Sequence, residues 1–169
     1  YPNYMSGLAS ATSMATPHIA GLLALLKEQY PYLSAEQLRE GLQYMVQDLG
    51  TPGFDEWYGH GLPKYKQADE QKIVQLLAEN HNAAQLKAQI DSLPKGLEKL
   101  ALLNNFNESQ QVVIKQLDEA FAAFSKKPSA AHYEQIEKRI AELASSALQK
   151  EKQQQLEAII LDYMASAEK

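Results

Sequence analysis

The sequence contains no cysteine, and this absence removes several kinds of chemistry together. Its 169 residues hold no thiol for a disulfide, for a thiol nucleophile or for a thiolate metal site. An exported protein and a cytosolic protein can both have this composition, so the cysteine count leaves the compartment open.

A strong excess of one charge and a long apolar run are also missing. The formal net charge is −5, with acidic and basic residues interspersed, so the chain has no electrostatic footprint for nucleic acid or anionic lipid. The longest apolar run, Ile19 to Leu26, has eight residues including Gly21, far fewer than the roughly 20 that cross a bilayer. With 45% hydrophobic residues, we expect a soluble globular protein with a core of its own.

The first residues carry no start or targeting signal. The sequence opens at Tyr1 without a Met and without a basic segment followed by an apolar one, so any targeting segment would lie upstream. We therefore expect the chain to be a fragment of a longer protein.

Glycine, proline and aromatic residues become scarce after about residue 68. Seven of the eight glycines, five of the seven prolines and nine of the fourteen aromatic residues precede Gln67. This change predicts mixed structure with many turns up to about Ala68 and nearly continuous helix beyond it. We therefore divide the chain into residues 1–68 and residues 69–169.

Two helices and a loop are predicted in the first part. A helix over about residues 13–29 ends because Pro31 disfavours the helical conformation of the residue before it. A second helix starts at Ser34, where Ser34 and Gln37 have the spacing of a capping box. Residues 49–63 are rich in glycine and proline, which predicts a loop with tight turns leading to a short final strand or turn.

Amphipathic helices that pack antiparallel are predicted in the second part. Apolar residues at helical spacing form separate stretches over residues 73–93, 97–103, 109–125 and 136–163. In the stretch 109–125, the residues predicted to face inward are Val113, Leu117, Ala120, Phe121 and Phe124. IVQLL resembles IKQLD, and LKAQIDSL resembles IEKRIAEL. These likenesses leave open whether the region is an internal duplication or a set of ordinary helices of similar composition.

The first predicted helix is apolar on all sides and has hydroxyl groups at its amino end. Residues 19–26 surround the helix, which is typical of a helix at the centre of a layered domain. Thr12, Ser13 and Thr16 precede or enter the first turn, where backbone N–H groups lack partners and the dipole favours negative charge. A hydroxyl there is placed to attack a carbonyl, although by spacing alone it is more often a helix cap. Pro17 costs little within the first turn and frees one carbonyl if it lies deeper.

The stretch TSMATPHIAG, residues 12–21, resembles the serine signature of subtilisin-like peptidases (subtilases), G-T-S-M-A-[ST]-P-H-[VI]-A-G. The likeness continues in the family's order through YPYLSAEQLREGL and LGTPGFDEWYGHGL and covers about residues 1–68. It implies the carboxy-terminal segment of an α/β peptidase domain, in which helices cover both sides of a parallel sheet. Since residues 1–68 supply almost none of the strands, we expect a mainly α chain: a fragment of that three-layer domain followed by an all-α hairpin or bundle region.

The resemblance implies roles for three neighbouring residues. Ser13 would be the nucleophile and its backbone N–H an oxyanion donor, and Thr12 would help to shape the oxyanion hole. Ala11 stands where the family usually has glycine, so its methyl group is expected to hinder substrate binding or to turn the loop. In the family's chain order Asp, His and the oxyanion Asn precede Ser, so all three would lie before Tyr1.

The histidines of the chain are weak substitutes for the missing base. His18 belongs to the signature, where a packed role is more usual, and His60 is expected to be an exposed loop residue. No histidine forms an H-x-x-x-H pair or meets a carboxylate at metal-ligand spacing, so we predict no metal or other cofactor from these residues. Subtilases often carry calcium, but no Asp-rich ligand loop is present in this sequence.

Three functions follow from these observations. The favoured one is a fragment of a bacterial serine endopeptidase, extracellular or associated with the cell wall, that hydrolyses protein substrates and is inactive without its upstream His and Asp. The second is a pseudoenzyme scaffold in which Ala11 has abolished the chemistry. The third concerns residues 69–169, which vaguely resemble helical repeats of Gram-positive surface proteins and would be a cell-envelope spacer or binding module. A plain helical bundle without a ligand is the alternative for that region.

Overall fold

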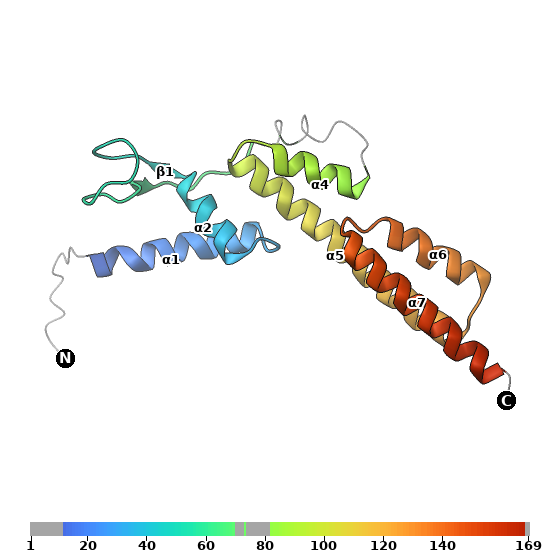
Figure 1. The fold of residues 1–169 in the computed structure, drawn as a ribbon. Helices are drawn as coiled ribbons and strands as arrows, with labels where there is room; N and C mark the ends of the chain where they lie inside the picture. Colours follow the sequence, from blue (N-terminus) through green and yellow to red (C-terminus); the bar gives the residue numbers. More distant parts are fainter. Residues whose placement is uncertain (1–11, 70–72, 74–81, 168–169) are drawn as a thin grey trace, which may run out of the picture. The chain divides into compact units, whose positions relative to one another are not determined.

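The computed structural model describes residues 12–69, 73 and 82–167. The chain divides into two compact units: the amino-terminal unit, Tyr1–Asp69, and the helical unit, Glu70–Lys169 (Figure 1). The mainly α fold expected from the sequence is confirmed for the part of the chain that the structure describes. Its elements are α1 (Thr12–Gln29), α2 (Ala35–Gln43), β1 (Val46–Gln47), β2 (Leu62–Pro63), α4 (Ala83–Ser92), α5 (Leu97–Lys126), α6 (Ala130–Ala141) and α7 (Ser146–Ala167).

The two helices that the sequence predicts in this unit, α1 and α2, pack together across a tight turn. Lys27, in the last turn of α1, holds the turn that follows the helix by donating from Nζ to the carbonyl oxygens of Pro31, at 2.7 Å, and Leu33, at 3.1 Å. The capping box is confirmed: Ser34 Oγ accepts from the Gln37 N–H, and Gln37 Oε1 accepts from the Ser34 N–H. Within residues 12–69, the buried residues are Leu26, Tyr30, Leu33, Leu38, Gly41 and Met45.

The loop that joins the two strands is held by backbone hydrogen bonds to the carboxylates of Asp55 and Asp48. β1 pairs antiparallel with β2, with Val46 opposite Pro63 and Gln47 opposite Leu62. Between them, Asp55 accepts hydrogen bonds from the backbone N–H groups of Tyr58, Trp57 and Thr51, and these bonds hold the pKa of Asp55 below its usual value. The predicted loop and final strand are present, whereas β1, only two residues long, has no signal in the sequence.

The main correction to the expected helices is that α5 is continuous. The sequence predicts a break between residues 97–103 and 109–125, but one helix of 30 residues spans both. Asn104 and Phe106 are buried in the intervening stretch, so tertiary packing holds the helix through it. Ser109 does not start a helix; its Oγ donates to the Phe106 carbonyl at 2.7 Å, a bond that a helix interior accommodates.

A second correction separates α6 from α7, where the sequence predicts one stretch over residues 136–163. The turn between them is held from α5, because Gln110 Oε1 accepts from the Ala144 N–H at 2.8 Å. Gln149 Nε2 also donates to the Leu143 carbonyl, at 2.7 Å. No glycine or proline marks this turn, and Gln110 is too far away in sequence for a local pattern to reveal it.

The carboxy-terminal half of α5 forms a bundle with α6 and α7 (Figure 1). Lys152 of α7 bonds Asp118 of α5 at 2.9 Å and lies over the Phe121 ring, 5.8 Å from its centroid. The prediction that Leu117, Phe121 and Phe124 face inward is confirmed. The core of this bundle consists of Leu117, Phe121, Phe124, Ile136, Ile140, Leu143 and Leu156.

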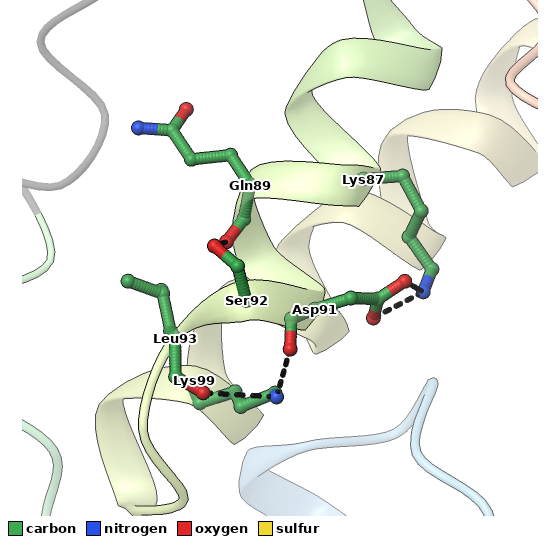
Figure 2. A network of polar contacts seen from close by, with 6 residues as sticks. All are labelled: Lys87, Gln89, Asp91, Ser92, Leu93 and Lys99. Atoms are coloured by element: carbon green, nitrogen blue, oxygen red, sulfur yellow. Dashed lines mark hydrogen bonds and ion pairs between the residues drawn. The ribbon is translucent and has the colours of Figure 1, made fainter.

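Lys99 of α5 closes the carboxyl end of α4, as Figure 2 shows. Its Nζ donates to the carbonyl oxygens of Asp91, at 2.6 Å, and Leu93, at 3.0 Å. The ammonium group thereby satisfies carbonyls that have no donor within α4 and opposes the negative end of its dipole. Lys87, in contrast, pairs with the Asp91 side chain on the exposed surface of the same helix.

Replacing Gly61 by alanine is expected to open the loop. Gly61 has φ +112°, and an added Cβ would press on the Gln47 carbonyl and lie 2.9 Å from the Asp48 Cα. We expect G61A to lower the free energy of loop opening by roughly 2–4 kcal/mol, measured by hydrogen exchange at the Asp55 and Gly59 amides. G53A is the matched control, because Gly53 also has a positive φ but no atom within 4 Å of the added Cβ. Equal effects of the two variants would contradict the close contact.

Removing the Lys99 ammonium group is expected to loosen the turn between α4 and α5. K99M keeps most of the apolar stem and should destabilise this turn by about 1–2 kcal/mol, the scale of hydrogen bonds from a charged donor. Hydrogen exchange of the α4 amides measures the change. K87M removes a surface pair whose partners are both exposed and should cost no more than about 0.5 kcal/mol. The assignment is wrong if K87M costs as much as K99M.

Candidate functional site

Ser13 lies at the amino end of the apolar helix. It is the second residue of α1, directly after Thr12, and both residues are exposed. The backbone N–H groups of this first turn have no acceptor within the helix, and the positive end of the helix dipole lies there. Backbone donors of this kind can stabilise an oxyanion.

Neither candidate base of the chain reaches Ser13. The His18 ring bonds through Nδ1 to the Met14 carbonyl at 2.9 Å, and five residues along a helix place it about 140° around the axis from Ser13. The His60 ring packs edge-on against Phe54, with the ring centroids 5.2 Å apart. Among the described residues, no histidine or carboxylate forms a hydrogen bond with Ser13. Ala11 lies outside the described residues, so its expected effect stays a prediction.

Two side chains form hydrogen bonds inside the first turns of α1, and Pro17 interrupts the backbone ladder between them. Thr16 Oγ1 donates to the Thr12 carbonyl at 3.1 Å, and the His18 ring reaches the Met14 carbonyl. Pro17 is inside α1, beyond its first turn, and has no N–H to donate to the Ser13 carbonyl four residues earlier. These hydrogen bonds of Thr16 and His18 were not predicted from the sequence. The available signal was that each side chain lies four residues after the carbonyl that it bonds.

An apolar groove begins beside Ser13. It has a volume of about 810 Å³ and is lined by Met14, Leu22 and Leu25 of α1 and by Leu62 and Pro63 of β2, among others. Met14, Leu25 and Leu62 are each about half exposed, at 48%, 49% and 51%. Leu26 is the one buried residue of α1, so this apolar helix is incompletely covered by the described part of its unit.

Two further features concern metals and membranes. Zinc sites gather several His, Cys, Asp or Glu ligands, and no three such side chains lie together within residues 12–69 and 82–167. No helix in the described part of the chain is both long and apolar enough to cross a membrane.

Residues of the amino-terminal unit match a family model and several known proteases. The family model described as the subtilase family matches residues 2–61. The chain is 39% identical over 119 residues to the minor extracellular protease Epr of Bacillus subtilis, a match that covers 70% of this chain and 18% of that protein. It is 42% identical over 62 residues to subtilisin DY of Bacillus licheniformis, covering 37% of this chain and 22% of that protein. An extracellular serine protease of Serratia marcescens is 42% identical over 60 residues, 36% of this chain and 6% of that protein.

The extent of these matches differs between the two units. Because the amino-terminal unit ends at Asp69, at least 50 of the 119 residues matched to the Bacillus subtilis protease lie in the helical unit. The chain spans less than a quarter of the length of each of these relatives. No solved structure matches it.

Proposed function

We propose that this chain, whose residues 2–61 match the model of the subtilase family, is part of an extracellular serine endopeptidase whose nucleophile is Ser13. The observation that carries the proposal is the position of Ser13, exposed at the amino end of α1 within the segment that matches the family. The printed names of two relatives, an extracellular protease and an extracellular serine protease, support the location.

The proposed reaction is acyl transfer to Ser13. Its Oγ attacks the carbonyl carbon of a peptide bond while a histidine, which the family order places before Tyr1, accepts the hydroxyl proton and passes it to the leaving amine. The backbone N–H of Ser13 donates to the oxyanion, and Thr12 shapes the hole. Water then releases the acyl group. An aspartate before Tyr1 orients the histidine, and an upstream asparagine is the second oxyanion donor.

The apolar groove supports the same proposal. In a three-layer α/β domain the central helix is covered by the sheet, which the polypeptide before Tyr1 would supply. Fully burying a side chain such as Met14, Leu25 or Leu62 stabilises a domain by roughly 1.5–3 kcal/mol. The half-exposed residues of α1 and β2 are therefore suited to a surface that another part of the domain covers.

The helical unit is proposed to be an accessory region of the same protease. At least part of it is shared with the Bacillus subtilis protease. Helix α5 has 30 residues, which corresponds to a rod of about 45 Å at 1.5 Å per residue. Between the two roles that the sequence suggests for this region, a spacer and a cell-wall-binding module, this length favours the spacer.

The isolated chain of 169 residues is expected to be catalytically inactive, because no described base bonds Ser13 and a serine is a weak nucleophile at its ordinary pKa. A fluorophosphonate probe should leave Ser13 unlabelled, as mass spectrometry of the intact chain would show. Subtilisin DY, treated in parallel, is the positive control. Stoichiometric labelling of Ser13 would contradict the expectation.

The complete polypeptide is expected to hydrolyse casein and to lose this activity when Ser13 is replaced. S13A removes the nucleophile and should lower kcat by at least about 10⁴-fold, the scale seen when a triad member is removed. S125A is the matched control, since Ser125 Oγ bonds only the Phe121 carbonyl in the helical unit. Hydrolysis that survives S13A would refute the assignment of Ser13. A complete polypeptide with no hydrolysis would support the pseudoenzyme scaffold instead.

A further inference from the structure

We propose that Thr16 and His18 are positioning residues for Ser13. Their side chains hold the two carbonyl groups on either side of the gap that Pro17 leaves in the helix ladder. The inference rests on the proposed function, because it takes Ser13 as the nucleophile. Neither side chain is placed in contact with substrate, so both act through the backbone of the first turns.

The hydrogen bond that Pro17 cannot make is the one to the carbonyl of Ser13 itself. In an α-helix the N–H of each residue bonds the carbonyl four residues earlier, so a proline at position 17 leaves the Ser13 carbonyl without its helical donor. The proline ring also crowds that carbonyl and tends to kink the helix. The Ser13–Met14 peptide unit is therefore the least restrained one in the turn that carries the reactive hydroxyl.

Side-chain donors restrain the peptide units on both sides of this gap. Thr16 Oγ1 lies 3.1 Å from the Thr12 carbonyl oxygen, and His18 Nδ1 lies 2.9 Å from that of Met14. Because a carbonyl oxygen only accepts, the His18 contact requires the proton on Nδ1. The two bonds add to the backbone ladder immediately before and immediately after Ser13. They limit how far the freed unit can tilt.

The expected consequence is a precise direction for the Ser13 hydroxyl. The direction of Oγ depends on the backbone angles of Ser13, and a misplacement of about 1 Å can cost on the order of 100-fold in rate. Since the restraint does not involve substrate contacts, its loss should lower kcat and leave KM nearly unchanged.

The first experiment compares matched variants of the complete polypeptide on a peptide substrate. T16V removes the hydroxyl and keeps the shape, and one net hydrogen bond corresponds to a fall in kcat of about three- to tenfold, with KM within about twofold. T16S restores a hydroxyl and should recover most of the lost kcat. H18F removes the ring donor and should lower kcat similarly, whereas H18N keeps an N–H at comparable reach and should lower it less. T51V, the same chemical change at an exposed loop residue, should leave kcat unchanged.

The second experiment tests whether Thr16 acts through the gap. P17A supplies the missing N–H to the Ser13 carbonyl, so T16V should lower kcat by less than about twofold in the P17A background. Rates are expressed per active site titrated with a fluorophosphonate, so that unfolded molecules do not count. Purely additive effects of T16V and P17A would overturn the inference.

The outcomes separate this inference from the proposed function. Absence of hydrolysis in the unaltered polypeptide, or hydrolysis that survives S13A, removes the proposed function and the inference with it. If the polypeptide is active and S13A is not, a T16V variant with unchanged kcat, or with a change in KM alone, overturns the positioning role and leaves Ser13 as the nucleophile.

Discussion

The burial of α1 is the constraint on which the amino-terminal unit depends. This helix is apolar on all sides, yet Leu26 is its one buried residue and Met14 and Leu25 remain about half exposed. A helix of this kind is stable at the centre of a domain. The same helix carries Ser13 at its amino end, so the packing of α1 and the placement of the proposed nucleophile depend on one element.

In both units a lysine holds a turn between two helices, but the two units differ in their cores. Lys27 in the amino-terminal unit and Lys99 in the helical unit each donate to two carbonyl groups at a turn between helices. The helical unit also has a closed cluster of buried apolar residues shared by α5, α6 and α7. The amino-terminal unit has a groove of about 810 Å³ where further packing would be expected. The described residues of α5, α6 and α7 therefore share one apolar core, whereas α1 and β2 keep half-exposed apolar side chains.

The part of the candidate site that a short sequence motif marks could be predicted from the sequence. The residues around Ser13 resemble a family signature, and the structure places them at the exposed start of a helix. The hydrogen bonds of Thr16 and His18 were not foreseen, because Ser, Thr and His bond backbone carbonyls only in some helix contexts. Among the described residues no base bonds Ser13, so this part of the proposed site could not be read from the sequence.

The sequence by itself determined the features that depend on neighbouring residues: the capping box at Ser34 and Gln37, the end of α1 before Pro31, and the inward face that includes Leu117 and Phe121. Only the tertiary structure decided that α5 continues through its polar middle and that Gln110 holds the turn between α6 and α7. The physical reason is distance along the chain. Caps and helix periodicity act within one or two turns, whereas the burial of Asn104 and the bond to Ala144 depend on residues that only folding brings together.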